Sequence, residues 1–404
     1  MAKGLVSDTN LTAIANAIRA KNGESDAYTP AEMAQAISDI PTSQVDQESA
    51  LKYMLENKTD YTGIAAGLTT LTELPEFTQP SGVKNFYGAF SNCRSLQRIE
   101  HLDVSSSNSS FQNMFYYCQN LTYVPDLDTV GSGSRSAESM FYYCQSLANL
   151  PALKWNTFNS CRNMLCRVPI ISFDETISVS GTYSGIENFA SMFSGCTSLN
   201  SVTLRGRGFK PTVNFASMFS GCTSLTSVEF LQHPSVSASA SIIKPTTSTN
   251  CASMFYNCSS LSNISSSVTD IVLVAGVPTV TTSMFSGCTS LTSIALGSNM
   301  NSATNCAGMF KGCAKLVDVA QMNLSAVSSD EYSTAGYGTS GMFQNCPALS
   351  SDALNNILAS LTTASKITTN KTLKYIGLTS AQATTCTGLS NWAALSAAGW
   401  TTGY

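Results

Sequence analysis

Apolar residues stand three positions apart in a phrase that this chain repeats. In Ser217–Val228 (SMFSGCTSLTSV) the apolar positions include Phe219, Cys222, Leu225 and Val228, and small polar residues fill most of the others. A period of three predicts a tight helical turn that runs into an extended segment. One such unit has an apolar edge that it cannot bury alone, so we expect the units to stack and to share one core.

The phrase recurs in nine clear copies and one degenerate copy, Cys161–Val168 (CRNMLCRV). Neighbouring clear copies are 25 or 26 residues apart at the closest, and Cys222 and Cys258 are 36 apart. Self-similarity at this period predicts a repeat fold of the α+β class, a solenoid of about ten irregular units. The expected repeat core is the Phe, Cys and Leu of each clear copy: Phe90, Cys93, Leu96, Phe115, Cys118, Leu121, Phe141, Cys144, Leu147, Phe193, Cys196, Leu199, Phe219, Cys222, Leu225, Phe255, Cys258, Leu261, Phe285, Cys288, Leu291, Phe310, Cys313, Leu316, Phe343, Cys346 and Leu349.

The repeated cysteine could be a metal ligand, half of a disulfide, a nucleophile or a small core residue. Nine of the 14 cysteines occupy this slot, and Val168 replaces the cysteine in the degenerate copy. A second slot, three residues before the Met, holds Cys251 in one copy and Phe215 in another. Because a slot that accepts different apolar residues is a core slot, we expect buried, reduced cysteines. Zinc sites use paired ligands, and no Cys-x-x-Cys pair occurs, so we expect no metal.

The composition of the 404 residues narrows the class of protein. Apolar residues make up 43%, which is ample for a core, but charged residues make up only 11%, against roughly 25% in an average soluble domain. Such a surface of hydroxyls and amides is common in extracellular and virion proteins. The net charge is −4 and no cluster of Lys and Arg occurs, so a nucleic-acid partner is not expected. No apolar run is long enough to cross a bilayer and no leader opens the chain, so we expect a soluble product that lysis releases, without membrane insertion.

The pattern Met-Phe-x-x-Cys-x-x-Leu-x-x-(Ile/Val) resembles the BspA-like leucine-rich repeats of bacterial surface proteins. It is also similar to related repeats in surface lipoproteins and phage proteins. The resemblance covers roughly residues 64 to 350 and implies a leucine-rich-repeat solenoid over residues 61–350. The connectors depart from the family pattern, because they vary in length and lack its regular return strand.

The first 60 residues are predicted to be helical. We expect one helix from about Thr9 to Lys21 and a second from Pro30 to Ile40. This hairpin has too little core to be stable alone, so we expect it to pack on its own copies or on a partner. A third helix, over residues 44–57, spaces Leu51 and Leu55 for a short bundle between subunits. The apolar residues expected to form the anchor are Leu11, Ile14, Ile18, Met33 and Ile37.

The words LTAIANAIRAKNG and YTPAEMAQAI in this segment are similar to an N-terminal segment of tail, baseplate and fibre proteins of phages that infect Gram-positive bacteria. The resemblance implies that residues 1–60 attach the protein to a virion or join its subunits. A simple structural start of the chain is the alternative. Phage fibres are usually trimers, so the resemblance also implies a homotrimer.

Residues 351–404 have a different pattern and are expected to form an α/β cap over the last repeat. We expect a helix capped by Asp352, a strand at 372–378 (TLKYIGL), and a helix from Thr379 or Ser380 through Leu395. The aromatic residues that suit the cap are Trp392, Trp400 and Tyr404. An aromatic platform for carbohydrate is the alternative for these three side chains.

Little in the sequence indicates catalysis. His101 and His233 are the only histidines and both stand in variable connectors, so we expect no Ser- or Cys-His triad. The acidic pair Asp174–Glu175 fits a solvated loop better than a glycosidase site, because adjacent acids on a strand point in different directions. We therefore expect a protein that is not an enzyme and that has no cofactor.

Binding suits this architecture better, because insertions in a solenoid gather on one face and often form its binding surface. The long connectors are rich in Ser and Thr and carry a few aromatic residues, although they could also be solvated loops. The candidate binding face comprises Tyr183, Phe230, Tyr332 and Tyr337.

These features favour a structural protein of a phage virion, a tail-fibre or receptor-binding protein that contacts a glycan or protein of the host cell surface. The expected partners are other virion proteins, bound through the N-terminal segment. Two alternatives remain: a head-fibre or decoration protein on the capsid, and a bacterial cell-surface adhesin with leucine-rich repeats.

Overall fold

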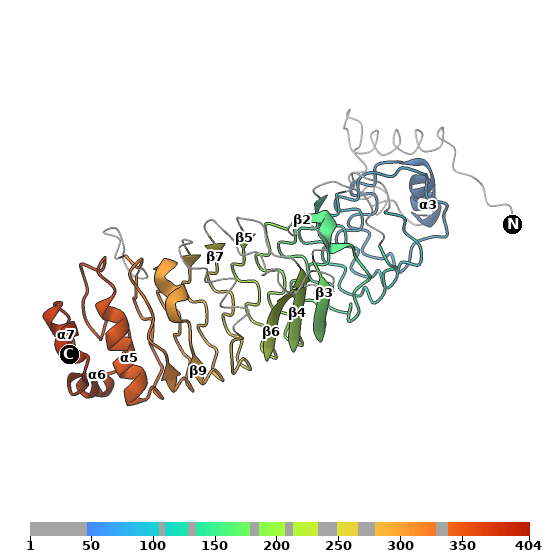
Figure 1. Ribbon diagram of the computed structural model, residues 1–404. Coiled ribbons are helices and arrows are strands. Elements are labelled where there is room, and N and C mark those ends of the chain that lie inside the picture. The colour runs from blue at the N-terminus through green and yellow to red at the C-terminus, as the bar shows by residue number, and fades with distance from the viewer. Residues whose placement is uncertain are drawn as a thin grey trace, which may run out of the picture. The chain divides into compact units, whose positions relative to one another are not determined.

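The computed structural model describes residues 47–104, 110–127, 135–177, 186–206, 213–232, 249–265, 279–328 and 338–404. These stretches belong to two compact units, unit 1 (Met1–Ile170) and unit 2 (Ile171–Tyr404). Each unit contains a stack of turns (Figure 1). The predicted helical anchor, which includes Leu11 and Met33, lies outside the described residues.

The repeated phrase forms a turn whose backbone hydrogen bonds alternate between two directions. Cys196 N donates to Phe193 O at 3.0 Å and Leu199 N donates to Cys196 O at 3.1 Å, so the apolar spacing of three follows bonds of the tight-turn type. Phe193 N instead donates to Met218 O in the next copy at 2.9 Å. Bonds of this second kind join successive copies, and the prediction of a stacked solenoid is confirmed.

The phenylalanines of successive copies form a column through the core of unit 2. The rings of Phe193, Phe219 and Phe255 follow one another at centroid distances of 5.4 and 5.3 Å, with interplanar angles of 4° and 14°. The column continues through Phe285 and Phe310 to Phe343. Fully burying a ring of this kind is worth about 1.5–3 kcal/mol, so each added turn extends a continuous apolar core.

Unit 1 contains a turn of this kind that lacks both Phe and Cys. Ala65 N donates to Ala89 O at 2.8 Å, as the Phe of a clear copy does to its neighbour. Ala65 and Leu68 therefore occupy the slots of Phe and Cys, and both are buried. The pattern Met-Phe-x-x-Cys does not include this turn, because the slots require apolar residues and not those particular ones.

The remaining elements of unit 1 are short. A 3-10 helix, η1 (Trp155–Thr157), leads directly into strand β2 (Phe158–Ser160), and β2 pairs in parallel with β1 (Arg135–Ser136). Further parallel bridges join neighbouring copies, for example Arg98 to Tyr123.

The helix α3 (Gln47–Asn57) covers the first turn of unit 1. Leu51 and Leu55 are at most 1% exposed within the single chain. The hydroxyl of Tyr61 donates to Leu55 O, and the Lys52 ammonium donates to Glu76 O. The prediction that Leu51 and Leu55 form a bundle between subunits is therefore wrong, because the chain's own first turn buries them.

Unit 2 builds parallel sheets from equivalent segments of successive copies. One sheet has the order β3-β4-β6, a second β10-β8-β7-β5 and a third β11-β9, and every pairing among them is parallel. These elements are β3 (Ser172–Thr176), β4 (Ser201–Gly206), β5 (Val213–Asn214), β6 (Ser227–Gln232), β7 (Thr249–Asn250), β8 (Thr279–Val280), β9 (Ser293–Ile294), the 3-10 helix η2 (Gly297–Ser302), β10 (Ala303–Asn305) and β11 (Asp318–Val319).

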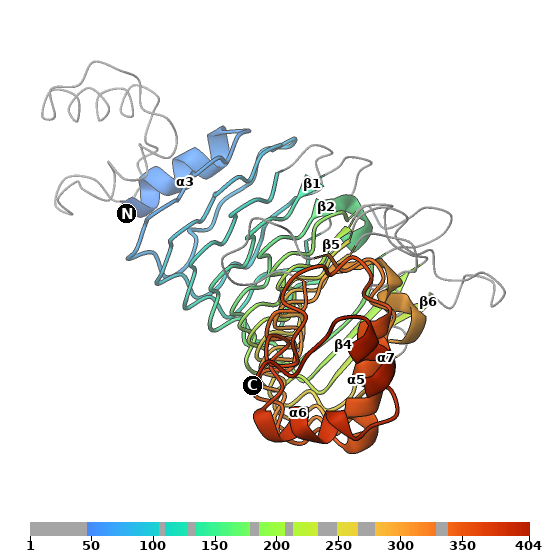
Figure 2. The same cartoon turned by 90° about the vertical axis from the view of Figure 1, so that its left-hand side faces the viewer.

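Three helices lie at the C-terminal end of the stack in unit 2 (Figure 2). They are α5 (Ser351–Thr362), α6 (Ser380–Thr387) and α7 (Trp392–Ala397). Their buried residues include Leu358 and Leu395, and Trp400 just after α7 is 2% exposed. The burial of Trp400 fits the cap, whereas Trp392 is half-buried and Tyr404 is 58% exposed.

Three details of this end differ from the sequence prediction. Ser350, and not Asp352, accepts the hydrogen bond that caps α5. Residues 372–378 form a turn with a bridge from Thr372 to Thr401 and no strand, because their bonds follow the repeat pattern. The long helix expected from Thr379 is two helices, since α6 ends at its C-cap Gly388.

Candidate binding surface

The predicted repeat core is buried throughout. The Phe, Cys and Leu of the nine clear copies are each at most 8% exposed. These residues therefore lie in the interior of the stack and present no surface to a ligand.

Eight of the repeated cysteines donate to a backbone carbonyl of the preceding copy. Cys93 Sγ donates to Ala65 O at 2.9 Å, Cys118 Sγ to Phe90 O at 3.0 Å and Cys222 Sγ to Phe193 O at 3.0 Å. All 14 cysteines lie in the described residues, where they are buried and form no disulfide. Burial raises the pKa of the Cys93 thiol to about 12, so this thiol stays neutral and unreactive at neutral pH.

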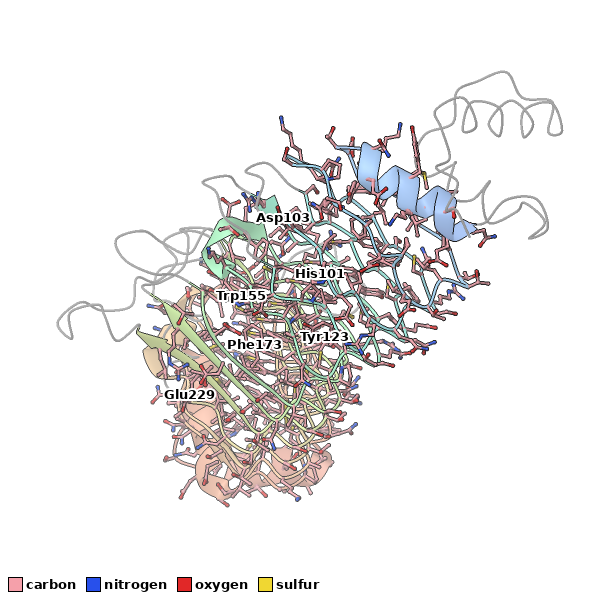
Figure 3. All side chains as sticks on the ribbon, turned by 90° about the vertical axis from the view of Figure 1, so that its right-hand side faces the viewer. His101, Asp103, Tyr123, Trp155, Phe173 and Glu229 are labelled. Carbon is pink, nitrogen blue, oxygen red and sulfur yellow. The ribbon has the colours of Figure 1, made fainter. Side chains whose placement is uncertain are left out.

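Of the four residues predicted to form the binding face, only Phe230 lies in the described residues. The prediction that Phe230 belongs to a binding face is wrong. Phe230 is 2% exposed and its ring lies 6.0 Å from that of Phe215. The strand β6 continues through Phe230, so its side chains alternate and Phe230 is buried. Its neighbour Glu229 is exposed (Figure 3). Tyr183, Tyr332 and Tyr337 lie outside the described residues.

The other candidates for chemistry that the structure describes are exposed or half-buried, and His233 lies outside the described residues. His101 and Asp103 are both exposed in a connector of unit 1 (Figure 3). In unit 2, Asp174 on β3 forms an ion pair with Arg205 on β4. Across the described stretches, no group of three His, Cys, Asp or Glu side chains could hold a metal ion.

Two shallow grooves are lined by described residues. One, of about 390 Å³, lies where β9 and β11 meet α5 and includes Asp318 and Asp352. The other, of about 460 Å³, lies between α3 and the first turn and includes Glu73 and Glu76. Neither lining contains a basic residue or a histidine, which leaves both grooves acidic.

A cluster of four half-buried tyrosines forms a more distinctive surface on unit 1. We call Tyr116, Tyr117, Tyr142 and Tyr143 the tyrosine strip. Tyr116 stacks on Tyr142 at a centroid distance of 5.0 Å, and Tyr117 stacks on Tyr143 at 4.6 Å. The two columns touch each other, since Tyr116 and Tyr117 lie 4.7 Å apart. The guanidinium of Arg167 lies 4.8 Å from the ring centre of Tyr143 and covers that end of the strip.

The backbone of the ladder places these side chains in register. Asn92 N donates to Tyr116 O at 2.7 Å, Tyr117 N to Tyr142 O at 2.8 Å and Tyr143 N to Cys166 O at 2.9 Å. The strip therefore has the spacing of the repeat itself, one tyrosine pair for each turn.

Two of the four tyrosines in the strip have an unfavourable backbone conformation. Tyr117 and Tyr143 have φ values of 60° and 63°, and Arg167 in the next copy has 60°. The slot before the cysteine is left-handed in the other copies too, where it is mostly glycine or asparagine, such as Gly195 and Asn257. Bulky residues rarely adopt this conformation. Three consecutive copies nevertheless have a bulky residue in this slot, and all three residues belong to or border the tyrosine strip.

The hydroxyls of Tyr116 and Tyr142 remain neutral at physiological pH. Burial raises the pKa of Tyr116, and the neighbouring Tyr117 adds to the shift. Burial also raises the pKa of Tyr142, with Cys166 as the next cause. A neutral phenol both donates and accepts hydrogen bonds, so the strip presents a row of such groups.

The sequence contained a signal for this surface that the search for connectors missed. Phe115–Cys118 and Phe141–Cys144 both read FYYC, where three other copies read FSGC. The sequence predicted binding aromatic residues in the long connectors, whereas these four tyrosines lie inside the repeated turn.

Comparison with known proteins shows the family. The stacked turns and parallel sheets define a repeat solenoid, and the sequence profile of the BspA type leucine-rich repeat region matches at residues 68–165, 138–241, 174–320 and 242–386. The chain belongs to this family.

The sequence matches no curated protein. Among solved structures, a leucine-rich repeat protein from Bacteroides ovatus is similar, with 18% identity and a TM-score of 0.35. That similarity covers 69% of this chain and 75% of the other. Among the described residues, no helix has the length and apolar character needed to cross a membrane.

Proposed function

We propose that this chain is a structural protein of a phage virion, a tail-fibre or receptor-binding protein that adheres to the host cell surface. In this proposal the tyrosine strip on unit 1 is the contact surface. Along the sequence, the repeat units would follow the N-terminal anchor and precede the cap formed by α5, α6 and α7.

The backbone of Tyr117 and Tyr143 is the observation that carries the proposal. A left-handed backbone costs a bulky residue about 1–2 kcal/mol, whereas a stacked aromatic pair returns about 0.5–1.5 kcal/mol. The strain at Tyr117 and Tyr143 therefore offsets the stacking of their rings, a cost that the glycine of other copies, such as Gly195, does not carry. Strained residues cluster at binding surfaces, and tyrosine is a common contact residue in them.

The virion part of the proposal rests on the sequence. The words at residues 11–23 and 28–37 are similar to the start of phage tail, baseplate and fibre proteins, and only 11% of the residues are charged. A capsid head fibre or decoration protein would fit the same two observations, with the same surface on the capsid.

The family supports a second candidate. BspA-like repeats resemble those of bacterial surface proteins, and the chain matches that family over most of its length. An adhesin on a bacterial cell would use the same strip, so the test of the contact surface applies to both candidates.

Binding of fluorescently labelled protein to a panel of Gram-positive cells tests the contact surface. The test variant is Y116S/Y117G/Y142S/Y143G, which writes the FSGC of other copies into both turns and is therefore expected to fold. The matched control is Y256S/N257G, which makes the same change in unit 2, where Tyr256 is 40% exposed. We expect the test variant to lose binding and the control to keep it.

Equal binding by the wild type and a folded test variant would overturn the assignment of the strip. Equal loss in the test and control variants would show that the effect is not specific to the strip. Binding of the wild type to no cell would favour the head-fibre candidate.

A further inference from the structure

We infer that the tyrosine strip binds a linear anionic polysaccharide, laid along the direction in which the turns stack. This inference names the ligand class for the proposed contact surface and so rests on the proposed function. It is carried by the charge around the strip, by the spacing of the turns and by the chemistry of the exposed groups.

The charge around the strip is positive. Arg94 is exposed and stands one copy before Tyr117, and Arg167 is exposed one copy after Tyr143. In the part of the chain that the structure describes, neither arginine forms an ion pair. Between the Phe slot and the Leu slot of these four copies no Asp or Glu occurs. Two arginines without a carboxylate therefore flank a neutral aromatic surface, on a chain whose net charge is −4.

The spacing of the turns favours a polysaccharide over a peptide. Parallel turns repeat every 4.7–4.9 Å or so, whereas an extended peptide advances only about 3.3 Å per residue. The tyrosine pairs follow this rise, with centroids 5.0 and 4.6 Å apart. The rise is close to the length of one sugar unit in an extended chain, so successive sugars can meet equivalent groups on successive turns.

The exposed groups suit sugar hydroxyls and acidic groups. The rings of the strip cover one another's faces, so their edges and hydroxyls are left to meet a ligand. Gln119 and Gln145 occupy the place after the cysteine that Arg94 has in its own copy, and they add amide groups beside the strip. An arginine binds a carboxylate or phosphate with paired hydrogen bonds. The two arginines lie three copies apart, roughly 15 Å at the rise of a parallel stack, and would engage acidic groups on separate sugars.

Binding of the whole chain to polygalacturonate tests the inference, with dextran as the neutral polysaccharide and poly-L-glutamate as the acidic peptide. The test variant is R94Q/R167N, because Gln and Asn stand in these slots in other copies, as at Gln119 and Asn257. We expect the wild type to bind polygalacturonate and not dextran or poly-L-glutamate. The variant is expected to bind roughly tenfold more weakly or worse.

Salt provides a second readout that a purely structural role would not move. In about 1 M NaCl, where the Debye length is about 3 Å, wild-type binding to polygalacturonate is expected to weaken strongly. Unchanged circular dichroism and thermal unfolding of R94Q/R167N would show that the loss is not a loss of folding.

Three results would overturn the inference. They are equal affinity for dextran and polygalacturonate, equal affinity for poly-L-glutamate, and no binding of polygalacturonate at all. If Y116S/Y117G/Y142S/Y143G loses cell binding while R94Q/R167N keeps it, the proposed function stands and the anionic ligand is wrong. If the tyrosine variant keeps cell binding, the proposed function itself fails.

Discussion

At the scale of single residues, the repeated cysteine acts as a core residue with one polar contact. Cys222 is fully buried and its thiol donates to the Phe193 carbonyl of the preceding copy. A weak S–H donor suits this position, because it satisfies a buried oxygen while remaining small and apolar enough for the core. A slot with this demand recurs once per turn, and this accounts for the recurrence of cysteine without any reactive role.

The variant Cys222→Ser is expected to lower the free energy of unfolding by about 1–3 kcal/mol, because the hydroxyl is more costly to bury than the thiol and fills less space. Urea denaturation of both proteins measures the change. The exposed neighbour Ser224 provides the control, and Ser224→Ala is expected to change stability by less than about 0.5 kcal/mol. A folded Cys222→Ser protein of normal stability that no longer binds cells would contradict the core role.

The buried thiols also predict how stability depends on pH. Burial raises the pKa of Cys93, Cys288 and Cys346 to about 12 in each case, whereas an unfolded thiol has a pKa of about 8.5. The folded protein therefore holds protons that the unfolded chain releases, and stability is fully present below about pH 8.5 and falls as pH rises towards 12. Urea midpoints between pH 7 and pH 11 measure this fall. Rapid alkylation of the folded protein by iodoacetamide at pH 8 would contradict it.

At the scale of elements, the C-terminal cap joins the stack through a close backbone approach at Gly377. This residue has a φ of 93°, and a Cβ built on it would lie 2.5 Å from the backbone N of Gln344. Gly82 is also left-handed, with a φ of 78°, but a Cβ there would meet nothing within 4 Å. Comparing substitutions at the two glycines therefore separates the free-energy cost of the left-handed backbone from the cost of a steric clash.

We expect Gly82→Ala to cost about 1 kcal/mol, from the left-handed backbone alone. Gly377→Ala is expected to cost at least about 1 kcal/mol more, because the Gln344 backbone cannot move without disturbing the last turn. Thermal unfolding of the two variants, followed by circular dichroism, compares them. Equal destabilisation would show that the cap is held less tightly to the last turn than the Gly377 geometry indicates.

The sequence predicted the elements to different degrees, for physical reasons that particular residues show. The repeat core followed from the period of three, because buried slots constrain residue type strongly. The apolar face of α3 was correctly found at Leu51 and Leu55, but amphipathicity shows that a face is buried and not what buries it. Phe230 was misplaced because the connector was taken to begin where the phrase ends, whereas β6 continues to Gln232. The tyrosine strip could not be predicted without the register of the turns, because that register places residues 116 and 142 side by side.

At the scale of the whole molecule, the burial of α3 changes where the proposed trimer can be joined. Leu51 and Leu55 cannot serve another subunit while they cover the first turn of their own chain. Subunit contacts through the N-terminus would then have to come from residues 1–46. A truncation at Tyr61 would remove the cover of the first turn and expose apolar residues such as Ile64 and Leu68, which are at most 4% exposed.

A chain that begins at Gln47 is therefore the appropriate comparison for the trimer. We expect analytical ultracentrifugation to give a trimer for the intact chain and a folded monomer for residues 47–404. The chain beginning at Tyr61 is expected to aggregate or unfold at lower temperature, because exposed apolar surface of this kind promotes association. The control is a Lys58→Ala variant of the intact chain, which changes an exposed residue at the end of α3 and is expected to keep the oligomeric state of the intact chain. The same oligomeric state for the intact chain and for residues 47–404 would show that the first 46 residues do not join the subunits. If both are trimers, the subunit contact lies on the solenoid itself.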